Sequence, residues 1–171
     1  IALFQELSGS RSGRRGNQTA GVSVRAVAAF VALPGRDRVL LLRAVATVAA
    51  VRLALPLFAV DRLRAWAGQL KSGKRPVDRI VWAVSAASRW LPGTTCLGSA
   101  LALQRLLSGE GHASELHIGV ARSGEQFSAH AWLACEGRIL IGEPEHDRFT
   151  RLVTWRVVEG PAPAAGKSGP A

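Results

Sequence analysis

The sequence predicts an α+β fold in which a run of helices comes first and a small antiparallel sheet follows. Apolar residues recur at helical spacing in three stretches between residues 37 and 107, and after Gly111 the period of the apolar pattern changes to two. Helices followed by strands are typical of a central helix packed on a sheet. The 171 residues suit a single core, because two full-sized enzyme domains need a longer chain.

The first helical stretch spans residues 37–70, and Pro56 is expected to kink or divide it. Its apolar run at residues 39–60 is long enough to cross a bilayer. Arg43 and Arg52 oppose a membrane-spanning helix, because they fall on opposite helix faces and each costs about 2.5–3.5 kcal/mol near mid-bilayer. We therefore expect a soluble or peripheral helix.

Two further helices are expected after a basic, turn-rich linker at residues 71–76. Residues 77–90 carry one apolar stripe at spacings of four and three. Thr94 and Thr95 are good N-cap residues for the next helix, at residues 96–107. That helix is apolar nearly all round, which predicts a buried central position.

Strands are expected at residues 116–121, 127–135, 138–142 and 150–158. The Glu-Gly pair at residues 136–137 is a two-residue hairpin signal. With that turn, Leu133 lies opposite Leu140 in the neighbouring strand. The same register places His130 opposite Glu143.

The positive charge is concentrated in the first half of the chain. The formal net charge is +10, and residues 1–95 hold 15 Lys and Arg against 4 acidic residues, whereas the rest holds 7 against 8. This excess favours docking to an acidic partner or an anionic membrane surface, and the alternative is an ordinary solvated face of a helical bundle. Nucleic-acid binding is not expected, because no zinc-finger, RNP or helix-turn-helix pattern accompanies the dispersed cations.

Cys96 is the candidate nucleophile. It occupies the first turn of the predicted central helix, where free backbone N–H groups and the helix dipole stabilise a thiolate and supply part of an oxyanion hole. The alternative is a buried cysteine that acts as a small apolar residue. The second cysteine, Cys135, is expected in the core with no bridge to Cys96. Two cysteines without a CxxC pair exclude a disulfide scaffold and a zinc ribbon, and they make a cytoplasmic location the default.

His130 is the candidate base, and in its strand it shares a face with Ser128 and Trp132. Its imidazole can accept the thiol proton and later protonate a leaving amine, while the carboxylate of Glu143 orients the ring. A longer turn would shift the register and make Asp147 the competing carboxylate. The alternative for Glu143 is a solvated edge residue.

The other histidines, His112, His117 and His146, have spacings that match no metal-binding pattern. We therefore expect solvated side chains there, and neither a metal nor a cofactor.

Two runs, RWLPGTTCLGSALALQRLLSGEGHASELHIGV and FSAHAWLACEGRILIGE, resemble the transglutaminase-like cysteine peptidases of lasso-peptide biosynthesis. The resemblance covers about residues 30–155, with CLxxALALxxLL and AHAW as its specific anchors. It implies a transglutaminase-like or papain-like core with Cys96 as nucleophile and His130 as general base. The third residue of that family is usually an aspartate just after the returning strand, where this chain has Glu143.

The resemblance also implies a reaction and its partners. The reaction is hydrolysis of the bond between leader and core in a ribosomally made precursor peptide, through a thioester. The chain has no room for a winged-helix recognition domain, so a separate leader-recognition protein and a separate ATP-using cyclase are expected. The alternatives are a transglutaminase-type acyl transferase, in which an amine intercepts the thioester, and a non-catalytic scaffold.

Four regions are expected along the chain. They are a disordered tail at residues 1–21, a basic helical region at 22–75, the transglutaminase-like peptidase domain at 76–160 and a second disordered tail at 161–171. The sequence begins at Ile1 and contains no Met, so the native start is expected to lie upstream.

Overall fold

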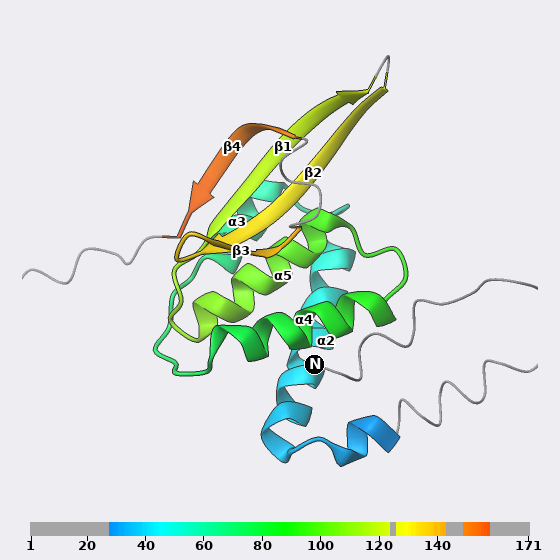
Figure 1. The fold of residues 1–171 in the computed structure, drawn as a ribbon, viewed down its shortest axis with the longest axis vertical. Coiled ribbons are helices and arrows are strands. Elements are labelled where there is room, and N and C mark those ends of the chain that lie inside the picture. The colour runs from blue at the N-terminus through cyan, green and yellow to red at the C-terminus, as the bar shows by residue number, and fades with distance from the viewer. Residues whose placement is uncertain (1–27, 124–125, 143–148, 158–171) are drawn as a thin grey trace, which may run out of the picture. The chain divides into compact units, whose positions relative to one another are not determined.

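A mixed helical and antiparallel architecture confirms the predicted α+β class. The computed structural model describes residues 28–123, 126–142 and 149–157, so both predicted tails lie outside the described residues. The elements are α2 (Gly35–Ala54), α3 (Val60–Ala67), α4 (Val77–Trp90), α5 (Cys96–Gly109), β1 (Glu115–Ser123), β2 (Gln126–Cys135), β3 (Arg138–Ile141) and β4 (Thr150–Arg156) (Figure 1). A short helical segment at residues 28–32 belongs to a separate unit, Ile1–Pro34. None of the helices in the described part of the chain is long and apolar enough to cross a bilayer.

α5 is the buried central helix that the sequence predicts. Ten of its 14 residues are buried, and Leu101, Leu103 and Leu107 have no exposed surface. α2, α3 and α4 pack against this helix, and β2 packs against it from the sheet. Figure 1 shows the sheet on one side of α5 and α4 on the other. An all-round apolar surface is stable only in such a position, since every face needs a packing partner.

The linker at residues 71–76 is held against the C-terminal end of α5. α2 ends at Ala54, before Pro56, because proline lacks the N–H that would continue the helical hydrogen bonds. Further on, Lys71 N–H donates to the Ser108 carbonyl (2.8 Å). A Cβ at Gly73 would lie 2.4 Å from Glu110 Cα, so only glycine fits this close approach.

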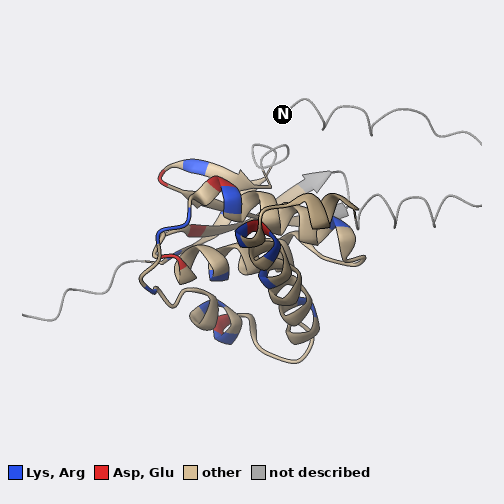
Figure 2. Cartoon of the chain, turned by 90° about the horizontal axis from the view of Figure 1, so that it is seen from below, with Lys and Arg blue, Asp and Glu red and all other residues tan. Residues whose placement is uncertain are grey.

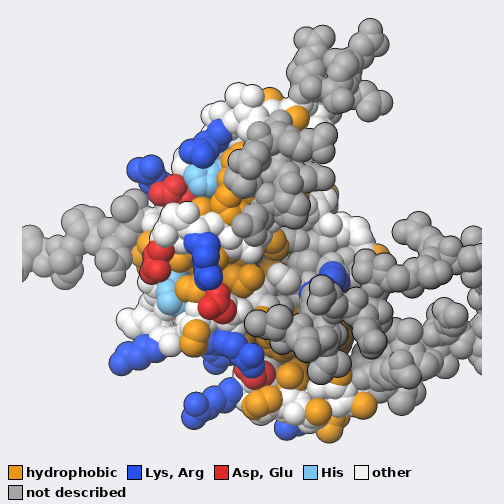
Figure 3. Space-filling model, in the orientation of Figure 1, with side chains coloured by type: hydrophobic (Ala, Val, Ile, Leu, Met, Phe, Trp, Pro, Cys, Tyr) orange, Lys and Arg blue, Asp and Glu red, His pale blue; other side chains and the backbone are white. Residues whose placement is uncertain are grey.

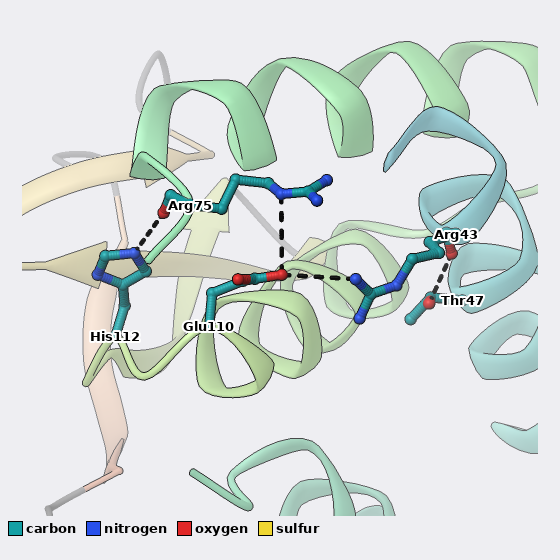
Figure 4. A network of polar contacts seen from close by, with 5 residues as sticks. All are labelled: Arg43, Thr47, Arg75, Glu110 and His112. Atoms are coloured by element: carbon teal, nitrogen blue, oxygen red, sulfur yellow. Dashed lines mark hydrogen bonds and ion pairs between the residues drawn. The ribbon is translucent and has the colours of Figure 1, made fainter. Parts of the chain in front are cut away.

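One carboxylate joins three segments at this end of α5 (Figure 4). Glu110 Oε1 lies 3.4 Å from Arg43 Nη1 of α2 and 3.8 Å from Arg75 Nε of the linker. His112 Nε2 donates to the Arg75 carbonyl at 2.7 Å. The linker is therefore fixed to the core by both main-chain and side-chain contacts. The domain boundary near residue 75 stays a prediction.

The four strands form an antiparallel sheet in the order β3-β2-β1-β4. The predicted two-residue turn is confirmed, with Glu136 at φ 51° and Gly137 at φ 75°, as hairpin turns require. The predicted register beyond it is wrong, because Leu133 pairs with Ile141 and not with Leu140. Leu140 is an extra residue in β3, a bulge that shifts the pairing by one position.

The two faces of the sheet have different environments. Leu116, Ala131 and Leu133 belong to the hydrophobic core that includes α5. The opposite face carries a stack of rings, in which Trp132 lies between His117 (centroids 5.5 Å apart) and His130 (6.3 Å). Strand alternation produces this division.

Candidate active site

Cys96 is the first residue of α5, and its side chain is exposed. Thr95 forms the N-cap, and its hydroxyl oxygen accepts a hydrogen bond from Gly98 N–H at 3.1 Å. By helix geometry, the N–H groups of Cys96 and Leu97 have no partner within the helix. They are available to stabilise a thiolate or a developing oxyanion. The position predicted for Cys96 is confirmed, and the alternative of a buried apolar cysteine is wrong.

The first turn of α5 is held in place from two sides. Ser99 Oγ donates a hydrogen bond to Ser88 Oγ of α4 at 3.0 Å. Leu55, just after the end of α2, lies near Gly98, since a Cβ built there would be 3.5 Å from Leu55 Cδ1. The Thr94 hydroxyl donates to the Leu91 carbonyl at 2.7 Å and shapes the preceding turn. A fixed helix start is what a reactive group at its first position needs for a defined direction of attack.

His130 lies on β2, half-buried, with its Nε2 3.2 Å from the Gly142 carbonyl oxygen. A carbonyl can only accept, so Nε2 donates, and the neutral ring carries its accepting lone pair on Nδ1. The ring also lies 5.1 Å from Phe149 and 6.3 Å from Trp132, between centroids. The ring thus has a defined tautomer and a defined plane, the two properties that a general base requires.

Among the described residues, the group that orients His130 is the Gly142 carbonyl. The sequence predicts the Glu143 carboxylate instead, with Asp147 as its competitor. Both residues lie outside the described part of the chain. The third member of the catalytic group therefore stays a prediction.

The structure describes no hydrogen bond between Cys96 and His130. α5 packs against the sheet face of Ala131 and Leu133, whereas His130 alternates onto the opposite face with Trp132. The structure thus gives each residue a suitable local geometry without joining the two.

Cys135 has the environment of an inert thiol. Its side chain is buried, and its sulfur donates to the Ala113 carbonyl at 3.2 Å. Burial raises the pKa of the Cys135 thiol, and the nearby Glu136 carboxylate adds to that rise. The predicted core position of Cys135 is confirmed, and both cysteines are free thiols.

His117 is the residue of this region that sequence reasoning missed. It was expected to be solvated, but it is only 5% exposed, and its Nδ1 lies 2.9 Å from Thr154 Oγ1. Burial lowers the pKa of His117, and the Arg151 charge lowers it further. The pairing of β1 with both β2 and β4 places His117 at the centre of the sheet. The feature that marks His117 as buried is its position directly opposite Trp132 in the β1–β2 pairing.

Within the described residues, no group of three His, Cys, Asp or Glu side chains could hold a metal ion. His112 is half-buried and donates to the Arg75 carbonyl, so it is not fully solvated as expected. His146 lies outside the described residues.

Comparison with known proteins places the chain in a superfamily. A family model of the transglutaminase-like superfamily matches residues 38–154. The chain therefore belongs to the transglutaminase-like superfamily, a superfamily of cysteine peptidases and acyl transferases. No curated protein and no solved structure matches the chain.

Proposed function

We propose that this chain is a cysteine peptidase that removes the leader from a lasso-type precursor peptide. The observation that carries the proposal is an exposed thiol at the first position of a capped, buried helix in a transglutaminase-like chain. The resemblance of the Cys96 and His130 segments to the leader peptidases of lasso-peptide biosynthesis adds the substrate class.

The proposed reaction requires the Cys96 thiol and the His130 imidazole, which the structure does not join by a hydrogen bond, to come together. His130 Nδ1 then takes the thiol proton. The thiolate adds to the carbonyl carbon of the scissile bond, and the N–H groups at the start of α5 stabilise the oxyanion. The imidazolium returns its proton to the leaving amine, which frees the core peptide and leaves the leader as a thioester. Water, deprotonated by His130, then hydrolyses the thioester and releases a leader that ends in a carboxylate.

In this mechanism the Glu143 carboxylate would share the Nε2–H of His130 with the Gly142 carbonyl. It would stabilise the imidazolium that forms when the thiol is deprotonated. Asp147 is the competing candidate. Glu143→Gln and Asp147→Asn separate the two candidates. Only the replacement of the residue that acts on His130 should lower the cleavage rate while the chain stays folded.

The partners of the proposed reaction are the precursor, a separate leader-recognition protein and a cyclase. The first half of the chain supplies positive charge for docking to an acidic partner or to an anionic membrane surface. Lys and Arg lie on several helices and on the sheet (Figure 2). On the face in Figure 3 several of them lie beside acidic side chains. The ion pairs of the described residues include Arg79–Asp37 and Arg138–Asp78. Binding to an acidic partner or membrane through Lys and Arg side chains that lack an acidic neighbour should weaken strongly between low and high salt.

The decisive test is mass spectrometry of a candidate precursor incubated with the chain and its recognition partner. We expect a free leader that ends in a carboxylate, at a rate that falls roughly 10³-fold or more in Cys96→Ala and His130→Ala. Cys135→Ala is the matched control, because it makes the same substitution at the buried cysteine and should retain cleavage.

Other outcomes identify the alternative functions. An amine-linked product in place of a free leader would replace the peptidase by an acyl transferase. Processing that survives Cys96→Ala intact would leave the chain as a scaffold for another protease.

A further inference from the structure

Helix α2 has two apolar stripes on opposite sides, and only one of them is packed. The packed stripe consists of buried residues: Leu40, Leu41, Ala44, Val48 and Val51. The second stripe recurs at spacings of three and four, and all of its members are exposed: Val39, Leu42, Ala46, Ala50 and Leu53. A helix at the surface of a globular protein normally turns polar residues outward. An apolar outer stripe of this length therefore marks a surface that binds another molecule.

The outer stripe reaches an apolar groove of about 390 Å³ between α2 and α3, which Ala50 helps to line. Among the other lining residues Val51 and Leu63 are buried, whereas Phe58 and Trp66 are exposed. The buried side chains form the bottom of the groove, and the two aromatic rings stand at its rim. A protruding apolar side chain can fill such a recess, whereas the flat surface of a bilayer does not reach its bottom. Aromatic side chains at a recess are also typical of the residues that contribute most to protein–protein binding.

Positive charge lies on both sides of Trp66. Arg62 lines the apolar groove, and Arg43, Lys71 and Arg105 line a second cavity of about 280 Å³ that shares Trp66 with it. The Arg105 guanidinium lies 4.8 Å from the Trp66 ring. No acidic residue of the described chain lines either cavity. Arg62 and Lys71 form no ion pair with any described residue, so their charges are available to a partner.

We propose that the groove between α2 and α3 docks an acidic amphipathic helix of a partner protein. The apolar side chains of the partner, at helical spacing, lie along the outer stripe of α2 and insert between Phe58 and Trp66. Its acidic side chains lie beside this apolar face, where Arg62 and Lys71 complement their charge. The inference gives the docking surface for the acidic partner of the proposed function, and it rests on that function only for which protein supplies the helix.

The test is an NMR titration of the full chain with a synthetic helical peptide of about 18 residues, or about five turns. Leucines occupy one face of the peptide, and glutamates flank them. We expect saturable shifts of the Trp66 indole N–H signal. A second peptide with glutamine in place of every glutamate should bind several-fold more weakly, because it lacks the negative charge. The titration requires no cleavage, so docking and peptidase activity can fail separately.

Phe58→Gln tests the apolar part of the groove. Half of the Phe58 side chain is exposed, so the variant should fold, and it should bind the glutamate peptide at least about tenfold more weakly. Leu152→Gln is the matched control, because it places the same amide at another exposed apolar residue, on β4 and outside the groove. Its affinity for the peptide should be unchanged.

Arg62→Gln tests the charge. It should weaken binding of the glutamate peptide about threefold at low salt and leave binding of the glutamine peptide unchanged. Lys74→Gln is the matched control, because it removes a positive charge outside both cavities, and it should bind both peptides as the parent chain does.

An unshifted Trp66 signal, equal binding of the two peptides, or equal binding by Phe58→Gln would overturn the proposal. Two further outcomes would replace the partner helix by another occupant. Binding to phosphatidylserine vesicles that requires Phe58, in a chain that does not bind the peptide, would assign the surface to a membrane. A dimer in analytical ultracentrifugation that Phe58→Gln dissociates would assign it to a second copy of this chain.

Discussion

The surroundings of the two cysteines differ at every level of structure. Cys96 begins a helix, is exposed and lies beside N–H groups that have no partner within the helix. Cys135 ends a strand, is buried and donates to a backbone carbonyl, and its pKa is raised. The same side chain is thus a candidate nucleophile in one place and a core residue in the other. The position on the secondary-structure element, and not the residue type, decides the chemistry.

The largest expected effect is a difference in alkylation between these two thiols. Iodoacetamide should label Cys96 in the folded chain on the order of 10² times faster than Cys135, because Cys135 reacts only after local opening and its thiolate is disfavoured. Peptide mapping by mass spectrometry measures both rates. Urea-unfolded protein is the control, since both cysteines should then react alike. Equal rates in the folded chain would remove the contrast.

A second prediction concerns the glycine next to His130. Gly142 has φ +87°, and a Cβ there would lie 2.8 Å from Trp132 Cβ and 3.0 Å from His130 Nε2. Gly142→Ala should lower the free energy of unfolding by about 2–3 kcal/mol and displace the imidazole. Urea denaturation and the NMR signals of the His130 ring measure the two effects.

Gly137→Ala is the matched control for Gly142→Ala. Gly137 also has a positive φ, +75°, but a Cβ there meets nothing within 4 Å. This variant should lose only about 1–2 kcal/mol, the cost of the backbone conformation. If both variants lose the same stability and neither moves the His130 signals, the contact between Gly142 and His130 has no consequence.

A third prediction concerns the cap that precedes Cys96. Thr95→Ala should lower the free energy of unfolding by about 1 kcal/mol, because Gly98 N–H loses its acceptor. It should also change the rate at which Cys96 is alkylated, since a frayed helix start no longer holds the thiol in one position. Thr95→Ser keeps the hydroxyl and should restore both properties. Unchanged stability in Thr95→Ala would show that the cap does not fix the first turn.

The smallest effect concerns the other partner of the Trp132 stack. The pKa of His117 is lowered in the folded chain, so the unfolded state binds more protons as the pH falls through the ordinary histidine range. The free energy of unfolding should therefore decrease from about pH 7 downward, until the folded chain also takes up the proton at His117. Chemical denaturation at several pH values should show a flatter dependence in His117→Gln. An identical slope in this variant would assign the pH dependence to other groups.

Local signals allowed much of the fold to be predicted. The bounds of α4, Val77–Trp90, follow from its apolar stripe, and the start of α5 follows from the Thr95 cap. The hairpin follows from the Glu136 and Gly137 pair. In each case residues within one turn of the chain determine the conformation.

The rest of the site depended on contacts between distant segments. The bulge at Leu140 changes the register of β3, and the residue types around Leu140 do not predict it. The burial of His117 requires strands on both sides of β1. The acceptor beside His130 is a main-chain carbonyl, and residue types carry no information about which carbonyl reaches a given side chain.

The bulge in β3 has a consequence for how durable the orientation of His130 is. One additional residue in a four-residue strand sets the phase of the chain where the strand ends, and there the oxygen of Gly142 meets the imidazole. A main-chain carbonyl oxygen does not take up a proton in the physiological pH range. A substitution at the same residue does not remove it. The ring is thereby held by a main-chain acceptor, which a substitution leaves in place unless the new side chain pushes the ring away, as expected for Gly142→Ala.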